Sequence, residues 1–148
     1  MTTNDETTLV ITRTFDAPPE QVFDAWTRRE EWQAWIGPEG VPCDVLLLEA
    51  HVGGRYRLDM HVPDGTVLPV SGAFKVIDRP KTLSFTWGRD GDPSQQSLIT
   101  LTFNDRDGKT ELTLRQEGLN NVSERDQVDQ GWNSAFNKLQ RFLRQEQP

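Results

Sequence analysis

The residue types that most often bind metals or act as nucleophiles are rare in this 148-residue sequence, which contains two histidines and one cysteine. His51 and His61 are ten positions apart and show no HxxxH spacing, and Cys43 has no second cysteine to complete a CxxC pair. A catalytic zinc ion usually takes three protein ligands, so the two histidines could form such a site only with Cys43 or a carboxylate as the third ligand. We therefore predict that the chain has no metal site and needs no cofactor.

Candidates for nucleophilic and acid–base catalysis are few. The sequence has no GxSxG elbow, and Cys43 follows Pro42 in an expected strand without a nearby base, so a structural thiol is the favoured interpretation. Tyr56 is expected on the apolar face of a strand, where its hydroxyl could orient a ligand carbonyl or donate a proton. The favoured alternative is a core ring whose hydroxyl bonds to a neighbour. No catalytic residue is predicted.

Composition limits the function classes further. The length fits one domain, which we place at 8–146 after a flexible N-terminus over 1–7. The 23 acidic residues outnumber the 16 Lys and Arg residues, and the net charge of −7 disfavours binding to nucleic acid. No apolar run approaches the ~18 residues of a membrane span, and no basic-then-apolar leader opens the chain. We expect a cytoplasmic protein without integral membrane association.

The N-terminal third is expected to form a strand followed by two short helices. Residues 8–16 are rich in β-branched side chains and predict a strand. Pro19 and Glu20 suit the first turn of a helix over 19–27, because proline tolerates that position and a carboxylate favours the positive helix end. A second helix over 29–36 carries Trp32 and Trp35 and ends at the Gly-Pro-Glu-Gly sequence of 37–40.

The middle of the chain predicts six further strands. The clearest is 54–62, where Tyr56, Leu58 and Met60 alternate with Arg55, Arg57 and other polar residues, a period of two. A second strand over 67–78 is expected to place both Phe74 and Val76 on its apolar face. The remaining strands are predicted over residues 42–50, 82–88, 97–104 and 109–117.

The last segment changes to helical periodicity. Apolar residues recur every three or four positions between 124 and 146, and Ser123 is a plausible N-cap. Seven strands and one long terminal helix predict an α+β fold, in which a curved antiparallel sheet is covered on its apolar face by that helix.

The apolar faces of these elements carry many large rings, which predicts an irregular cavity between sheet and helix. Gly131 interrupts the last helix at a cost of about 1 kcal/mol relative to alanine, which indicates either a close approach or room left for a cavity. The residues predicted to line this cavity and bind a ligand are Trp35, Tyr56, Leu58, Met60, Phe74, Phe85, Trp87, Leu101, Trp132, Phe136 and Leu139.

Four sequence segments, in order, resemble a known family. They are WQAWIGPEG (32–40), EAHVGGRYR (49–57), GAFKVIDRPKTLSFTW (72–87), and the closing pair QEG (116–118) and GWNSAFNKL (131–139). Together they resemble the activator of Hsp-90 ATPase homologues, of the C-terminal-domain type, within the START-like or SRPBCC superfamily. The resemblance covers roughly residues 8–145. Glu49 and His51 depart from the family pattern, which has Asp and Arg before the paired glycines.

The resemblance implies a helix-grip fold with a hydrophobic cavity between the sheet and the C-terminal helix. Three functions follow as expectations, because superfamily members bind lipids, sterols or polyketides, some catalyse cyclisation and others assist a chaperone. Our leading hypothesis is binding of a small hydrophobic, aromatic or lipid-like molecule. The alternatives are a polyketide-cyclase- or hydrolase-like enzyme that uses Tyr56 in the same cavity, and a chaperone-associated interaction module. A homodimer is left open.

Overall fold

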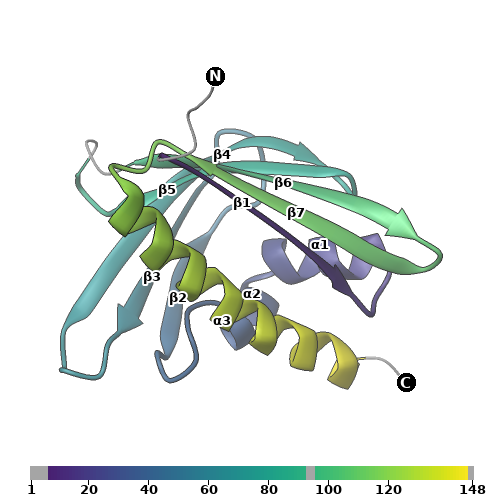
Figure 1. The fold of residues 1–148 in the computed structure, drawn as a ribbon, viewed down its shortest axis with the longest axis horizontal. Coiled ribbons are helices and arrows are strands. Elements are labelled where there is room, and N and C mark those ends of the chain that lie inside the picture. The colour runs from purple at the N-terminus through teal and green to yellow at the C-terminus, as the bar shows by residue number, and fades with distance from the viewer. Residues whose placement is uncertain (1–6, 93–95, 147–148) are drawn as a thin grey trace.

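The structure is a computed structural model in which residues 7–92 and 96–146 are described. It has the predicted α+β architecture, a seven-stranded antiparallel sheet with two short helices after the first strand and a long C-terminal helix (Figure 1). The elements are β1 (Thr8–Phe15), α1 (Pro19–Thr27), α2 (Arg29–Trp35), β2 (Cys43–Leu48), β3 (Arg55–His61), β4 (Val67–Asp78), β5 (Thr82–Arg89), β6 (Ser97–Arg106), β7 (Lys109–Glu117) and α3 (Val122–Glu146). The expected flexible N-terminus lies outside the described residues except for Thr7, whose carbonyl oxygen accepts a hydrogen bond from the Leu119 amide.

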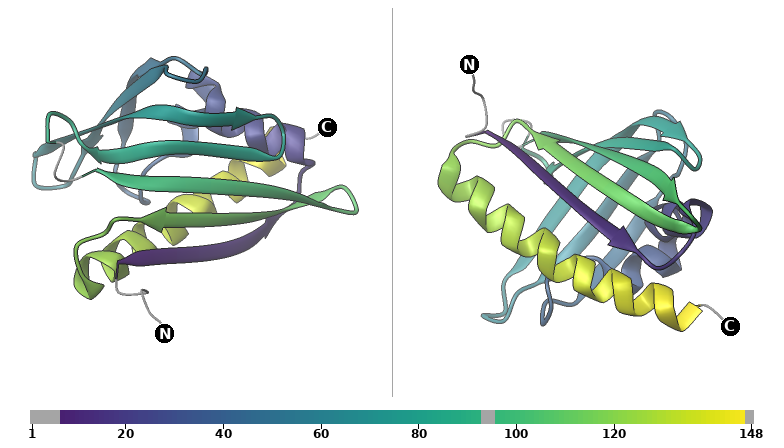
Figure 2. Two further views of the ribbon diagram at one scale, coloured as in Figure 1. Left: turned by 90° about the horizontal axis from the view of Figure 1, so that it is seen from above. Right: turned by 45° about the vertical axis from the view of Figure 1, so that its right-hand side comes forward.

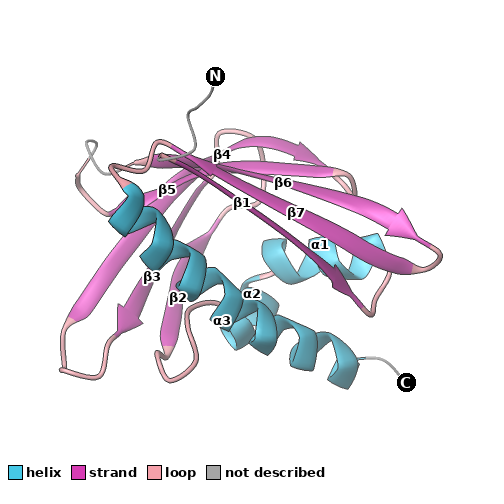
Figure 3. Cartoon of the chain, in the orientation of Figure 1, coloured by secondary structure: helices cyan, strands magenta, loops and turns pink. Residues whose placement is uncertain are grey.

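The strand order is β1-β7-β6-β5-β4-β3-β2, so six strands follow one another as a meander and β1 closes the sheet beside β7. The connection from β1 to β2 therefore spans the whole sheet, and α1 and α2 occupy it. All three helices lie on one side of the sheet, which curves around α3 (Figure 2). Figure 3 shows the same division into one strand layer and one helix layer.

Alternation along the strands decides which side chains face the helices. In β3 the side chains of Tyr56 and Leu58 are buried, whereas Arg55 and Arg57 are exposed. β6 and β7 repeat this pattern, and their inward positions carry apolar side chains such as Leu101 and Leu114. The predicted phase of these strands is confirmed, and most of their outward-facing side chains are polar.

The predicted phase of β4 is wrong after Phe74. The pairing with β5 passes from Phe74–Phe85 to Val76–Ser84, which inserts one extra residue into β4 as a bulge. The bulge reverses the alternation, so Ile77 packs on the core and Val76 is 42 % exposed. Periodicity assumes a regular strand and cannot register this inserted residue.

The start of α3 also differs from the prediction. The helix begins at Val122, and the side-chain Oδ1 of Asn121 accepts a hydrogen bond from the Glu124 backbone amide at 2.8 Å. The Glu124 carboxylate bonds in turn to the backbone amide of Asn120 at 3.0 Å. Asn121, rather than Ser123, therefore caps the helix, because its side chain reaches the free amide of the third helical residue.

Candidate functional site

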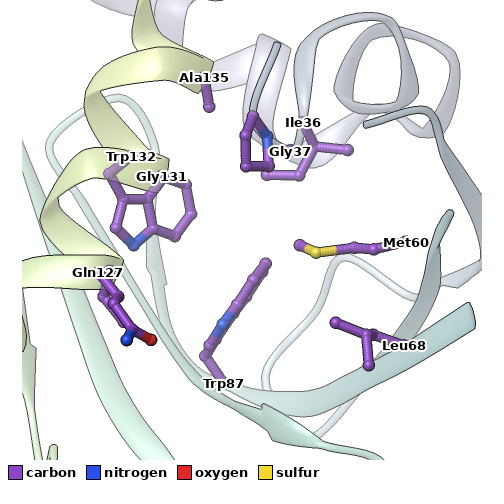
Figure 4. Close-up of a pocket in the computed structure, with 11 residues that line it drawn as sticks. Ile36, Gly37, Met60, Leu68, Trp87, Gln127, Gly131, Trp132 and Ala135 are labelled. Carbon is purple, nitrogen blue, oxygen red and sulfur yellow. The ribbon is translucent and has the colours of Figure 1, made fainter. Parts of the chain in front are cut away.

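A pocket of about 330 Å³ opens between the N-terminal half of α3 and the ends of β3, β4 and β5. Its size falls at the lower end of the ~300–1,000 Å³ typical of small-molecule sites. Figure 4 shows the indoles of Trp87 and Trp132 on one side, with Met60 and Leu68 across from them. We call this space the apolar pocket, and it is lined by Ile36, Gly37, Pro38, Met60, Leu68, Trp87, Gln127, Val128, Gly131, Trp132 and Ala135.

Gly131 keeps the helix wall of the apolar pocket open. A Cβ atom added there would meet only the Pro38 ring, at 3.8 Å, which is an ordinary van der Waals contact. The glycine is therefore not needed for close approach between α3 and the sheet. Of the two explanations that the sequence allowed, the structure favours room left for a cavity.

A buried chain of hydrogen bonds joins the two tryptophans of the pocket wall. The Trp132 indole Nε1 donates to the Gln116 amide oxygen at 2.9 Å, and the Gln116 amide nitrogen donates to Ser97 Oγ at 2.8 Å. Ser97 Oγ then donates to the Trp87 carbonyl oxygen at 2.9 Å. This series of hydrogen bonds runs from α3 through β7 and β6 to β5. It therefore holds the Trp132 indole against the strand that carries Trp87.

The sequence interpretation missed Gln116. This side chain occupies an inward position of β7, in phase with Leu112 and Leu114, and is 1 % exposed. A glutamine at an inward strand position could have indicated a buried hydrogen-bonding role, because an unpaired buried amide costs about 1–3 kcal/mol. Its partner on α3 could not be identified without the crossing of helix and sheet.

The eleven predicted lining residues fall into two groups. Met60, Trp87 and Trp132 line the apolar pocket. The other eight do not: they are buried in the core, away from its lining, and comprise Trp35, Tyr56, Leu58, Phe74, Phe85, Leu101, Phe136 and Leu139.

Aromatic packing explains why these eight residues leave no space between them. Trp26 of α1 lies at the centre, with ring centroids 4.7 Å from Trp35, 5.6 Å from Trp132 and 6.2 Å from Phe85. Edge-to-face and tilted pairs of this kind fill a core closely. These rings therefore form a closely packed core, which we call the solid core, and the apolar pocket lies beside it under the N-terminal half of α3.

Tyr56 belongs to this solid core. Its hydroxyl donates a hydrogen bond to the Thr86 carbonyl oxygen at 2.5 Å, and its ring packs edge-on against Trp32 at 5.2 Å. Burial raises the pKa of the Tyr56 hydroxyl well above its usual value. The interpretation of Tyr56 as a core ring with a bonded hydroxyl is confirmed.

The residues considered for metal binding or nucleophilic chemistry lie apart from the pocket lining. Burial raises the pKa of the Cys43 thiol to about 11, so it remains protonated near neutrality. His61 Nε2 lies 2.9 Å from Asp44 across the β2–β3 pair, whereas His51 Nδ1 lies 3.2 Å from the Val52 carbonyl oxygen. Within 7–92 and 96–146, no three His, Cys, Asp or Glu side chains cluster as metal ligands would. The absence of a metal site stays a prediction for the purified protein.

Fold and pocket together define a helix-grip domain, a curved antiparallel sheet closed around its C-terminal helix with an apolar pocket between them. A family model described as "Activator of Hsp90 ATPase homolog 1-like protein" matches residues 16–144, and the chain belongs to this family. Among the described residues, no helix is both long and apolar enough to cross a bilayer.

Curated relatives and solved structures agree with this assignment. The human and mouse proteins named "Activator of 90 kDa heat shock protein ATPase homolog 1" are 30 % identical over 129 residues, which is 86 % of this chain but 34 % of theirs. The chain thus spans about a third of the length of these relatives.

Similar folds occur in bacterial proteins of comparable size. A Chromobacterium violaceum protein superimposes with a TM-score of 0.86 at 24 % identity, covering 93 % of this chain and 96 % of its own. A Silicibacter pomeroyi protein titled AHSA1 gives a TM-score of 0.80 at 26 % identity, with coverage of 95 % and 99 %.

Proposed function

We propose that this chain binds a small hydrophobic, aromatic or lipid-like molecule in the apolar pocket beneath α3. The observation that supports this proposal most strongly is the chemistry of the pocket lining. Two indoles face aliphatic and methionine side chains, and none of the described lining residues is ionisable. Burying an apolar ligand there contributes roughly 25 cal/mol for each Å² of apolar surface removed from water. The hydrogen bonds of Trp132 hold part of the wall in place before a ligand arrives, which lowers the entropic cost of binding.

Binding is favoured over the enzyme alternative by the placement of Tyr56. A proton-handling tyrosine would have to reach the ligand, whereas this hydroxyl is directed to the Thr86 carbonyl oxygen outside the lining of the apolar pocket. Catalysis also needs ionisable groups that converge on the bound molecule. The apolar pocket presents none from the described residues.

Trp87 and Trp132 make the pocket observable by intrinsic fluorescence. We expect titration with the apolar fluorophore N-phenyl-1-naphthylamine to quench tryptophan emission saturably, at one probe per chain, because both indoles line the pocket. Trp87→Phe should lower the affinity for the probe, because it replaces an indole of the pocket lining with a smaller ring. Trp35→Phe is the matched control, since Trp35 lies in the solid core. A chemically broad set of apolar probes that gave no saturable change would contradict the proposal.

A protein contact is the second candidate, and it rests on exposed apolar side chains at the β2 end of the sheet. Leu46, Leu47 and Val52 are 50 %, 41 % and 65 % exposed, and β2 is an edge strand. Exposed apolar groups on a sheet edge are typical of interaction surfaces. The names of the human and mouse relatives make an Hsp90-class chaperone the partner to test.

We expect the purified chain to change the ATPase rate of such a chaperone, and Leu46→Ser/Leu47→Ser to weaken that change. Val10→Ser is the matched control, because Val10 is equally exposed but lies on β1 at the opposite edge of the sheet. An unchanged ATPase rate at saturating wild-type protein would exclude this second candidate without affecting the ligand proposal.

A further inference from the structure

The apolar pocket continues into a second hollow of about 390 Å³ along α3 toward the helix N-terminus. The two spaces share four lining residues, Met60, Leu68, Trp87 and Val128. Because these side chains border both spaces, the two spaces are adjacent, and we call them together the groove. We call the second space the polar hollow.

The polar hollow differs chemically from the apolar pocket. Its lining adds the charged or hydrogen-bonding side chains of Arg89, Asp92, Ser97, Gln116 and Glu124. The groove therefore runs from an apolar end, near Ile36 and Ala135, to a polar end near the close of β5 and the first turn of α3. A single molecule that occupies both ends must itself be amphipathic.

The charges of the polar hollow are not equally available to a ligand. The two Glu124 carboxylate oxygens accept hydrogen bonds from the backbone and side-chain nitrogens of Asn120, at 3.0 and 3.1 Å. Asp92 is engaged as well. Arg89 is exposed, and its guanidinium makes no ion pair with any residue that the structure describes. These hydrogen bonds leave the negative charge of Glu124 in place, but Arg89 is the charged side chain of the hollow whose polar atoms no described residue occupies.

Gln116 adds hydrogen-bonding capacity beside this cation. An amide group can donate two hydrogen bonds and accept two. The contacts of Gln116 with Ser97 and Trp132 use one donor and one acceptor position. One N–H and one lone pair of this buried amide therefore remain for an oxygen-bearing group at the polar end.

We propose, on the basis of the function proposed above, that the groove takes a single-chain amphiphile with a carboxylate head. Its apolar chain lies in the space between the two indoles on one side and Met60 and Leu68 on the other, and its head lies between the Arg89 guanidinium and the Gln116 amide. A charge-assisted hydrogen bond from arginine is about twice as strong as a neutral one, which favours a carboxylate over a hydroxyl. The net charge of −7 attracts cations over longer distances, but salt screens that field beyond about 10 Å.

Three ligands with the same unbranched eight-carbon chain separate the effect of the head group from that of the chain: octanoate, octan-1-ol and octyltrimethylammonium, each followed by tryptophan fluorescence and calorimetry. We expect octanoate to bind most tightly, and Arg89→Gln to weaken its binding about tenfold while leaving octan-1-ol unchanged. Arg115→Gln is the matched control. It makes the same charge change on the exposed face of β7, outside the groove, and should leave all three affinities unchanged.

The outcomes distinguish this inference from the proposed function. Equal affinity for the three ligands, or tightest binding of octyltrimethylammonium, would overturn the carboxylate assignment and leave apolar binding intact. An Arg89→Gln variant that binds octanoate like the wild type would do the same. Binding of none of the three, nor of the fluorophore, would overturn both. Unchanged octan-1-ol binding by Arg89→Gln also demonstrates that this variant is folded.

Discussion

Gly72→Ala is expected to destabilise the fold by roughly 3 kcal/mol, because overpacking costs about 1–3 kcal/mol and a lost hydrogen bond about 1. A Cβ atom at position 72 would lie 1.9 Å from the Thr86 carbonyl oxygen and 2.7 Å from the Tyr56 ring. The first of these atoms is backbone and cannot move independently. The substitution therefore has to displace β5, the Tyr56 ring or both, and it threatens the Tyr56–Thr86 hydrogen bond.

Urea and thermal denaturation measure this effect, and for a chain of this length a loss of 3 kcal/mol lowers the melting temperature by roughly 10 °C. Gly131→Ala is the matched control, because its added Cβ meets only Pro38 at 3.8 Å and alanine favours a helix by about 1 kcal/mol. We expect this control to be as stable as the wild type or more so. A Gly72→Ala protein that melts with the wild type would contradict the close packing assigned to Tyr56.

Gly131→Leu is expected to reduce binding of N-phenyl-1-naphthylamine at least tenfold. The leucine side chain would project from the helix wall into the apolar pocket, where Trp132, Trp87 and Val128 also lie, and would occupy space that the ligand needs. Tenfold corresponds to about 1.4 kcal/mol, less than the cost of losing the burial of one aliphatic side chain.

Gly131→Ala separates loss of space from loss of the glycine itself. The alanine variant keeps most of the pocket volume, so its probe affinity should stay close to that of the wild type. Thermal melting of Gly131→Leu identifies any overpacking, which costs about 1–3 kcal/mol. A folded Gly131→Leu variant with wild-type affinity would place the ligand somewhere other than the apolar pocket.

Local patterns predicted most of the elements. The helix over 19–27 and the strand over 67–78 match α1 and β4 in both bounds, because helix-start residues, turn residues and side-chain periodicity are properties of neighbouring positions. The inward residues of β3 were predicted for the same reason. Burial of one face leaves only one of two possible phases.

Features that depend on contact with a second segment could not be predicted from local sequence patterns. The bulge after Phe74 exists because β4 pairs with β5 out of simple register, and it exposes Val76. The Asn121 cap depends on where the chain leaves β7 and enters α3. Neither pairing nor chain direction is encoded in the periodicity of a single segment.

The difference between what the sequence predicts and what tertiary packing decides is clearest at the apolar pocket. The sequence determined that many large rings face inward and that Gly131 lies inside the last helix, and both features are present in the structure, where α3 runs unbroken through the glycine. Only the tertiary structure decided where the open space lies. Trp26 of α1 packs against Trp35 and Trp132 and fills the interior on one side, whereas Gln116 holds Trp132 beside the groove that remains. Space is what side chains from distant segments leave unfilled, so its location depends on all of their packing at once.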